Sequence, residues 1–252
     1  MKNLVLRALT ATMVLTFLFF CHNASVNAEQ IIKTLDDNTK MTPPGTRAIE
    51  LRDIPEFKKG TAVTLNDNGE VIEGILSAAI MLPCVDGVPF YYRFYEAAQI
   101  PMANRILKFK ENTKVTFNDS GEVVRGTVAG GLLGIPVSKA NYISLRDGTE
   151  IIFHGNGIPA SCTLDFDTYL RPVGWQKNLT AGYTNKINCA GFAEFTGGRQ
   201  VELNDKGEVT KGTLNKDAKL LSLDGSFKIY GAGTTVEFDE NGVVVKAVNP
   251  AN

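Results

Sequence analysis

Histidine is nearly absent from this chain, and its scarcity limits the chemistry that the protein can perform. The 252 residues contain two histidines, and His22 lies in an N-terminal segment that we expect to be removed. A Ser-His-Asp or Cys-His catalytic set would therefore have to use His154. No nucleophile elbow, zinc signature or phosphate-binding glycine loop is present in the sequence. A hydrolase remains a minority hypothesis, based on His154 or on a pair of carboxylates, and nothing indicates a cofactor.

An excess of basic residues is also lacking. The chain has 26 Lys and Arg against 27 Asp and Glu, which gives a formal net charge of −1. Loss of Lys2 and Arg7 with the N-terminal segment changes the net charge to −3. Because no basic patch stands out, the sequence argues against a nucleic-acid-binding surface.

A second long hydrophobic run is missing, and the first has the pattern of an export signal. The first 28 residues carry Lys2 and Arg7 near their start, continue with an apolar run from Ala8 to Phe20, and end in small residues before Glu29. The apolar run is too short to span a bilayer comfortably. We therefore expect cleavage before Glu29, no stable membrane span afterwards, and a mature protein that is periplasmic or secreted and associated with the cell envelope.

Cysteines are few, and three of the four remain after cleavage: Cys84, Cys162 and Cys189. An odd number in an exported protein allows at most one disulfide and leaves one thiol. If a pair forms, we favour Cys162 with Cys189, because both lie in the same half of the chain. The alternative is that all three are small buried hydrophobic side chains.

What the sequence does contain is a short sequence motif that recurs five times. Each copy has alternating apolar residues followed by Asn-Asp-x-Gly-Glu or a variant, and the copies centre on Asn66, Asn118, His154, Asn204 and Asp239. The alternation is typical of a half-buried strand, and Asp-x-Gly suits a type I turn with glycine in a G1 bulge. The predicted turn residues are Asp67, Gly69, Asp119, Gly121, Asp205, Gly207, Glu240 and Gly242.

The oxygen-rich turns raise the question of calcium. An EF-type loop needs oxygen ligands from its first to its twelfth position, with glycine sixth. Here Gly121 follows Asn118 by only three residues, and the residue two positions before Asn118 is Thr116, where a calcium loop would have a carboxylate or amide ligand. The spacing therefore favours turn chemistry, and no metal site is predicted. We interpret His154, which holds the Asn position in the third copy, as a turn residue as well.

Long and short intervals alternate between the copies, at 52, 36, 50 and 35 residues. Two hairpins thus form a larger unit, and a fifth hairpin closes the chain. We predict an all-β protein of stacked antiparallel hairpin repeats that form a curved sheet or solenoid, with a closed barrel or sandwich as the alternative. The expected parts are a signal peptide (1–28), a polar leader (29–47), a first repeat unit (48–144), a second repeat unit (145–228), and a terminal capping hairpin with a tail (229–252).

Two local details are expected within these parts. The polar leader contains Pro43-Pro44-Gly45, and we expect it to be loose, with a helical turn near Ile31. In three copies the returning strand, which is the second strand of the hairpin, contains a glycine. In one of these copies Val123 and Val128 would point to opposite faces unless one residue is inserted between them. We therefore predict a bulge or sharp bend at Gly74, Gly126 and Gly212.

The repeated motif resembles the hairpin repeats of the MORN type, in which a turn with glycine is followed by a strand that ends in a Gly-Thr-Leu-like group. The resemblance covers about fourteen residues per copy, as in Val201 to Leu214. The aromatic-x-Gly opening of that family is missing, and the copies are farther apart. The resemblance implies an interaction or scaffolding surface and carries no catalytic residue over.

The two long intervals contain aromatic residues interleaved with arginine. Stacking faces and forked donors of this kind suit a sugar or a peptide, although aromatic side chains also fill ordinary cores and interfaces. The predicted ligand-binding residues are Tyr91, Tyr92, Arg93, Tyr95, Tyr169, Arg171, Trp175 and Tyr183. These expectations combine into an exported, non-enzymatic module at the cell envelope whose partner is a protein or a cell-wall polymer. The alternative is a structural envelope protein that forms homo-oligomers through open sheet edges.

Overall fold

The computed structural model describes residues 30–45, 54–85, 91–94, 98–101, 106–130, 132–138, 141–178 and 191–249. In these ranges the protein is all-β, as expected, and its only helix is α2 (Trp175–Asn178). No helix in the described part is long and apolar enough to cross a membrane. The predicted export signal, Tyr95, Tyr183 and Cys189 lie outside the described residues.

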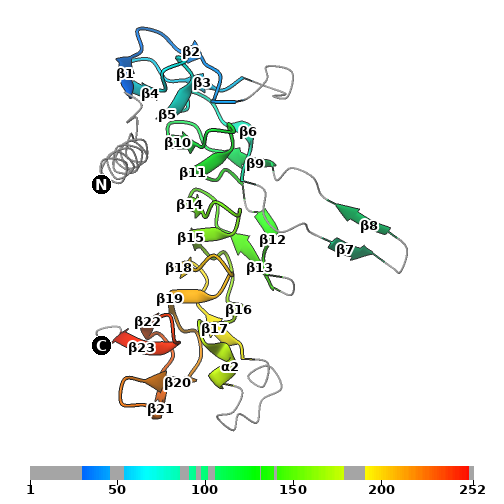
Figure 1. Ribbon diagram of the computed structural model, residues 1–252, viewed down its shortest axis with the longest axis vertical. Helices are drawn as coiled ribbons and strands as arrows, with labels where there is room; N and C mark the ends of the chain where they lie inside the picture. The colour runs from blue at the N-terminus through cyan, green and yellow to red at the C-terminus, as the bar shows by residue number, and fades with distance from the viewer. Residues whose placement is uncertain are drawn as a thin grey trace, which may run out of the picture.

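The largest element is an open sheet of 13 strands whose order is β1-β4-β5-β10-β11-β14-β15-β18-β19-β22-β23-β20-β21. Its strands lie across the long axis of the molecule (Figure 1). The repeated motifs form five hairpins that lie side by side in this sheet: β4 (Ala62–Leu65) with β5 (Val71–Ile75), β10 (Lys114–Phe117) with β11 (Val123–Thr127), β14 (Glu150–Phe153) with β15 (Pro159–Thr163), β18 (Gln200–Leu203) with β19 (Val209–Thr213), and β22 (Thr235–Phe238) with β23 (Val243–Val248). Because the sheet is not closed, the barrel alternative is wrong.

The two ends of the sheet are formed by strands outside the five hairpins. At one end β1 (Ile31–Thr34) pairs antiparallel with β4. At the other end β20 (Ala218–Ser222) pairs in parallel with β23, and β21 (Phe227–Tyr230) pairs antiparallel with β20. The hairpin predicted to cap the chain is therefore followed in the sheet by one more hairpin, β20–β21.

The expectation of a loose leader with a helical turn near Ile31 is wrong. Ile31 lies in β1, and the buried Leu35 follows it. The backbone N–H of Leu35 donates to the Thr61 carbonyl at 3.1 Å, as the N–H of Leu214 donates to the Thr234 carbonyl at 2.9 Å in a later copy. The leader thus supplies half of an additional repeat, which consists of the second strand of a hairpin (β1) and the buried leucine directly after it.

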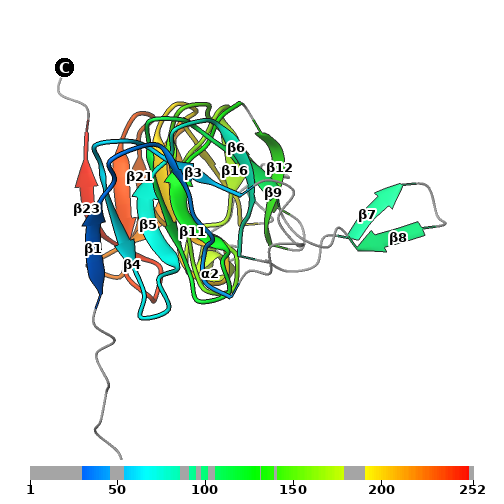
Figure 2. The same cartoon turned by 90° about the horizontal axis from the view of Figure 1, so that it is seen from above.

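Small two-stranded sheets accompany the large sheet along one side (Figures 1 and 2). Four of them are β2 (Thr39–Lys40) with β3 (Glu56–Phe57), β6 (Ile80–Pro83) with β9 (Ile106–Phe109), β12 (Leu132–Ser138) with β13 (Asn141–Leu145), and β16 (Thr168–Leu170) with β17 (Ala193–Phe195). One continuous hydrophobic core runs from Leu35 to Val244 between the two layers. A fifth pair, β7 (Tyr91–Phe94) with β8 (Ala98–Pro101), stands away from the rest of the molecule in both views.

Large side chains from the small sheets pack against the glycines of the returning strands. Phe109 is fully buried, and a Cβ added to Gly126 would lie 2.6 Å from its ring. The same arrangement recurs with Phe57 and Gly74, and with Phe195 and Gly212. These glycines are therefore present because a ring occupies the space that a side chain would need.

The predicted bulges are present, but two residues before these glycines. In the first hairpin Leu65 pairs with Val71 and Thr64 with Glu73, so that Ile72 is the extra residue. The other four hairpins show the same shift. The inserted residue places both Val71 and Gly74 on the buried face, and the bulge assignment to the glycine itself is corrected.

The Asn-Asp-x-Gly-Glu turn satisfies its own polar groups. The side-chain oxygen of Asn118 accepts from the backbone N–H groups of Ser120 and Glu122 at 3.0 and 2.9 Å, and its Nδ2 donates to Glu122 Oε2 at 2.8 Å. In the fifth copy Asp239 accepts from two backbone N–H groups in the same way, and Val243 replaces the glutamate. A carboxylate has no N–H to satisfy, which explains why glutamate accompanies only asparagine.

This pairing gives a first prediction. Glu122→Val should destabilise the protein by about 0.5–1.5 kcal/mol, because the Asn118 Nδ2 group loses its acceptor. Asn118→Asp together with Glu122→Val reproduces the fifth copy and should recover most of that loss. Urea unfolding of the three variants measures both effects. Equal stability of the single and the double variant would contradict this role for Glu122.

Candidate functional site

The structure separates the predicted ligand-binding residues into two groups. Tyr91, Tyr92 and Arg93 lie on β7, whose backbone pairs with β8 in the hairpin that stands away from the body. Tyr169, Arg171 and Trp175 lie within β16, the following turn and α2. The second group is brought together and forms the candidate site.

The chain places this second group on one face by simple alternation. Leu170 points into the core and is fully buried, so its neighbours Tyr169 and Arg171 point to the other face of the small sheet. The turn that follows Pro172 leads directly into α2, which begins at Trp175. Helix and strand therefore present their side chains to the same region.

Arg171 stacks against two aromatic rings. Its guanidinium carbon lies 4.0 Å from the centroid of Trp175 and 4.7 Å from that of Phe192. A planar, permanently charged guanidinium favours such contacts with ring faces. The stack holds a cation in a defined orientation on the surface of an insert.

A second cation lies beside Tyr169. Lys216 Nζ is 2.8 Å from Glu194 Oε2 and donates to the Tyr169 hydroxyl at 3.1 Å. The Glu194 side chain is only 11% exposed, so the ammonium group compensates a largely buried carboxylate. Hydrogen bonds to Glu194 and then to Tyr169 raise the pKa of Lys216, which keeps it charged.

We call this surface the aromatic–basic face; it consists of Tyr169, Arg171, Trp175, Phe192, Glu194 and Lys216. It combines half-buried ring surfaces with two oriented cations from three separate segments of the chain. Such a face can bind by stacking and by charge-assisted hydrogen bonds. The carboxylate of Glu194 is engaged by Lys216.

Phe192, Glu194 and Lys216 were not predicted from the sequence. Phe192 and Glu194 flank the buried Ala193 in β17, so an alternating pattern was available. Lys216 stands two residues after Leu214, the residue that directly follows β19. Only the arrangement of the two layers brings Lys216 to Tyr169. The first two residues could have been found from their period, whereas the third required the fold.

His154 and the acidic turns lie elsewhere and make structural contacts. His154 Nε2 lies 2.8 Å from the Leu203 carbonyl oxygen of the neighbouring hairpin. Among the described residues, no group of three or more His, Cys, Asp or Glu side chains could hold a metal ion.

The two described cysteines are buried. Cys162 carries a free thiol, and burial raises its pKa to about 12. Cys189, its predicted disulfide partner, lies outside the described residues, so the pairing stays a prediction. Cys162 occupies the position that Gly126 holds in its own copy, where it packs as a small hydrophobic side chain.

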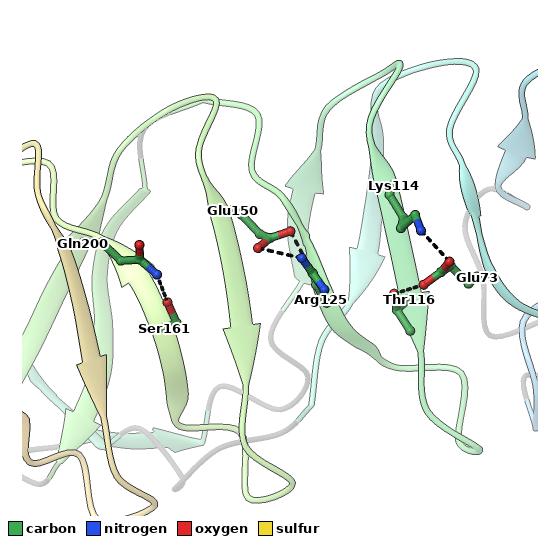
Figure 3. A network of polar contacts seen from close by, with 7 residues as sticks. All are labelled: Glu73, Lys114, Thr116, Arg125, Glu150, Ser161 and Gln200. Atoms are coloured by element: carbon green, nitrogen blue, oxygen red, sulfur yellow. Dashed lines mark hydrogen bonds and ion pairs between the residues drawn. The ribbon is translucent and has the colours of Figure 1, made fainter. Parts of the chain in front are cut away.

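The outer face of the large sheet is polar and internally paired (Figure 3). Lys114 Nζ lies 2.7 Å from Glu73 Oε1 on the neighbouring hairpin. Arg125 binds Glu150 through Nε at 2.8 Å and through Nη2 at 3.1 Å, and this contact raises the pKa of Arg125. Exposed pairs of this kind contribute little stability each, but they match neighbouring hairpins to one another.

Comparisons with known proteins give no match: no family model, no curated protein and no solved structure is similar to the chain. What the protein does has therefore to be inferred from its own residues.

Proposed function

We propose that this protein is an exported, non-catalytic hairpin-repeat protein that binds a partner at the cell envelope through the aromatic–basic face. The hairpins stack as a solenoid-like scaffold, and the insert around α2 is the recognition element. The stack of Arg171 against Trp175 and Phe192 carries the proposal. It orients a cation on a segment whose backbone is fixed to β19, because the Arg171 carbonyl accepts from the Val209 N–H at 2.8 Å.

The scaffold supports this role because its parts are mutually dependent. Each hairpin hides one apolar face only when a neighbouring copy and the second layer cover it. Inserts between such copies can vary without disturbing the stack, which makes them suitable positions for binding residues. The resemblance to MORN-type hairpins agrees with an interaction or scaffolding role.

The chemistry of the face favours a cell-wall polymer as the partner. The half-buried rings of Tyr169 and Trp175 suit the flat faces of sugar rings. Arg171 and Lys216 suit carboxylate or carbonyl groups attached to those sugars. A protein that offers the same groups is the alternative partner.

Arg171→Ala and Trp175→Ala should each weaken retention on isolated envelope material about tenfold or more, because truncation of a well-packed Arg or Trp anchor often costs over 1.4 kcal/mol. A co-sedimentation assay measures retention, and circular dichroism checks the fold. The matched control is Arg125→Ala, which removes an arginine from the outer sheet face and should leave retention unchanged.

Protease treatment of the envelope material separates the two kinds of partner. Retention that survives digestion indicates a polymer, and retention that disappears indicates a protein. If Arg171→Ala is retained as strongly as Arg125→Ala, the aromatic–basic face is not the binding site.

A further inference from the structure

The large sheet ends in two edge strands that each expose an aliphatic side chain. Among the described strands, β1 and β21 each have a single neighbour in the sheet. Ile32 in β1 is 73% exposed, and Ile229 in β21 is 72% exposed. Edge strands normally avoid exposed aliphatic side chains because unpaired backbone groups recruit other strands.

Both exposed isoleucines lie on the same face of the sheet. Ile32 pairs with Thr64, which in turn pairs with Glu73 on the polar outer face. Ile229 pairs with Lys219, whose neighbours Ala218 and Leu220 point into the core. Each isoleucine therefore extends the outer face at its own end of the sheet.

The directions of the two edge strands are complementary. β1 is antiparallel to β4, the first strand of its hairpin. β23 is antiparallel to β22, β20 is parallel to β23, and β21 is antiparallel to β20. β21 therefore runs in the direction of the first strands of the hairpins, and β1 runs against it. When β21 of one molecule lies beside β1 of another, the antiparallel order of the sheet continues.

We propose that the protein assembles head to tail, with β21 of one copy pairing with β1 of the next. The contact joins two different surfaces, so it is heterologous and leaves a free edge at each end of every assembly. Repetition of the contact produces an open, unbranched filament whose axis follows the stack of hairpins. Backbone hydrogen bonds between the edges and mutual burial of Ile32 and Ile229 stabilise it.

This inference does not depend on the proposed function. None of the residues of the aromatic–basic face lies in β1 or β21. A filament would repeat that face at regular intervals and would increase the avidity for a polymer. Loss of assembly and loss of envelope retention can therefore be measured in separate variants.

The test uses Ile32→Lys and Ile229→Lys, each of which blocks one end. Sedimentation velocity over a range of concentrations should show that the mean mass of the processed protein increases with concentration. Each variant alone should remain monomeric, because every contact needs both kinds of edge. An equimolar mixture should form dimers and nothing larger, since each variant keeps one intact edge.

The controls separate assembly from general effects of a surface lysine. Met81→Lys changes a residue on β6 that is 51% exposed, and it should assemble like the original protein. Melting temperatures verify folding, and Ile32→Ser with Ile229→Ser gives a milder pair of changes. A protein that stays monomeric at all concentrations, or a mixture that forms no dimers, overturns the proposal. A single blocked variant that dimerises alone also overturns it, because its intact edges would then pair with one another.

Discussion

Gly207→Ala should lower the stability of the protein far more than Gly69→Ala. Both glycines hold the same place in the hairpin turn, with φ values of 77° and 76°, so alanine is strained to the same extent at each. A Cβ at Gly69 meets nothing within 4 Å. A Cβ at Gly207 would overlap the carbonyl oxygen of Val137, which belongs to β12.

The expected magnitudes follow from this difference. Gly69→Ala should cost about 1–2 kcal/mol, the usual cost of a left-handed backbone for alanine. Gly207→Ala should cost about 3–5 kcal/mol, because backbone in β12 has to move as well. Urea unfolding measures both changes in the free energy of unfolding. Equal losses would mean that β12 does not pack on this turn.

The contact at Gly207 represents a general way in which the two layers interlock. A Cβ at Gly242 would overlap the carbonyl of Val173, and one at Gly45 would lie 2.6 Å from the carbonyl oxygen of Asp119. In each case a segment in or after a strand of a small sheet reaches the turn of a later hairpin. The hairpins are therefore held both by strand pairing and by these crossing segments.

The hairpins of the large sheet could be predicted because their signals are local. An Asn-Asp-x-Gly turn and its flanking alternation occupy fewer than fifteen residues, and the structure confirms strands around each copy. The half repeat formed by β1 was missed because no Asn-Asp-x-Gly sequence precedes it and Lys33 stands where three other copies have glycine. Its Thr34-Leu35 ending does match Thr213-Leu214.

The second layer was harder to predict, because inserts of different length interrupt its strands. One signal was nevertheless constant. In the first four hairpins the large residue that packs on the returning strand stands nine residues before the turn residue and 17 residues before its glycine or cysteine partner, as with Phe109, Asn118 and Gly126. A period of 17 residues matches neither helix nor strand, so it becomes meaningful only when the two layers are known.

The aromatic–basic face was predictable in the part that one short segment supplies. Tyr169, Arg171 and Trp175 fall within seven residues. Phe192 lies directly before β17, and Lys216 lies between β19 and β20 of the large sheet. Contacts between distant segments depend on the path of the chain, which the spacing of motifs does not encode.

The pairing of ring and glycine leads to the second large prediction. Gly126→Cys places a Cβ 2.6 Å from the Phe109 ring carbon and should cost about 1–3 kcal/mol through overpacking. Phe109→Leu alone should also destabilise the protein, by about 1–2 kcal/mol, since it removes part of a buried ring whose full truncation costs 3–5 kcal/mol. Each change alone creates a mismatch between the two layers.

The two changes together should be less harmful than the sum of the single changes. The third copy already combines Leu145 with Cys162 at these positions, and both residues are buried there. We expect a favourable coupling energy of about 0.5–3 kcal/mol, as is found for residues in direct contact. A double-mutant cycle by urea unfolding measures this coupling, and Gly126→Ala with Phe109→Leu repeats it without a thiol. Additive losses would mean that the leucine and the cysteine of the third copy are unrelated. They would also mean that the Phe109 ring is not the reason for a glycine at position 126.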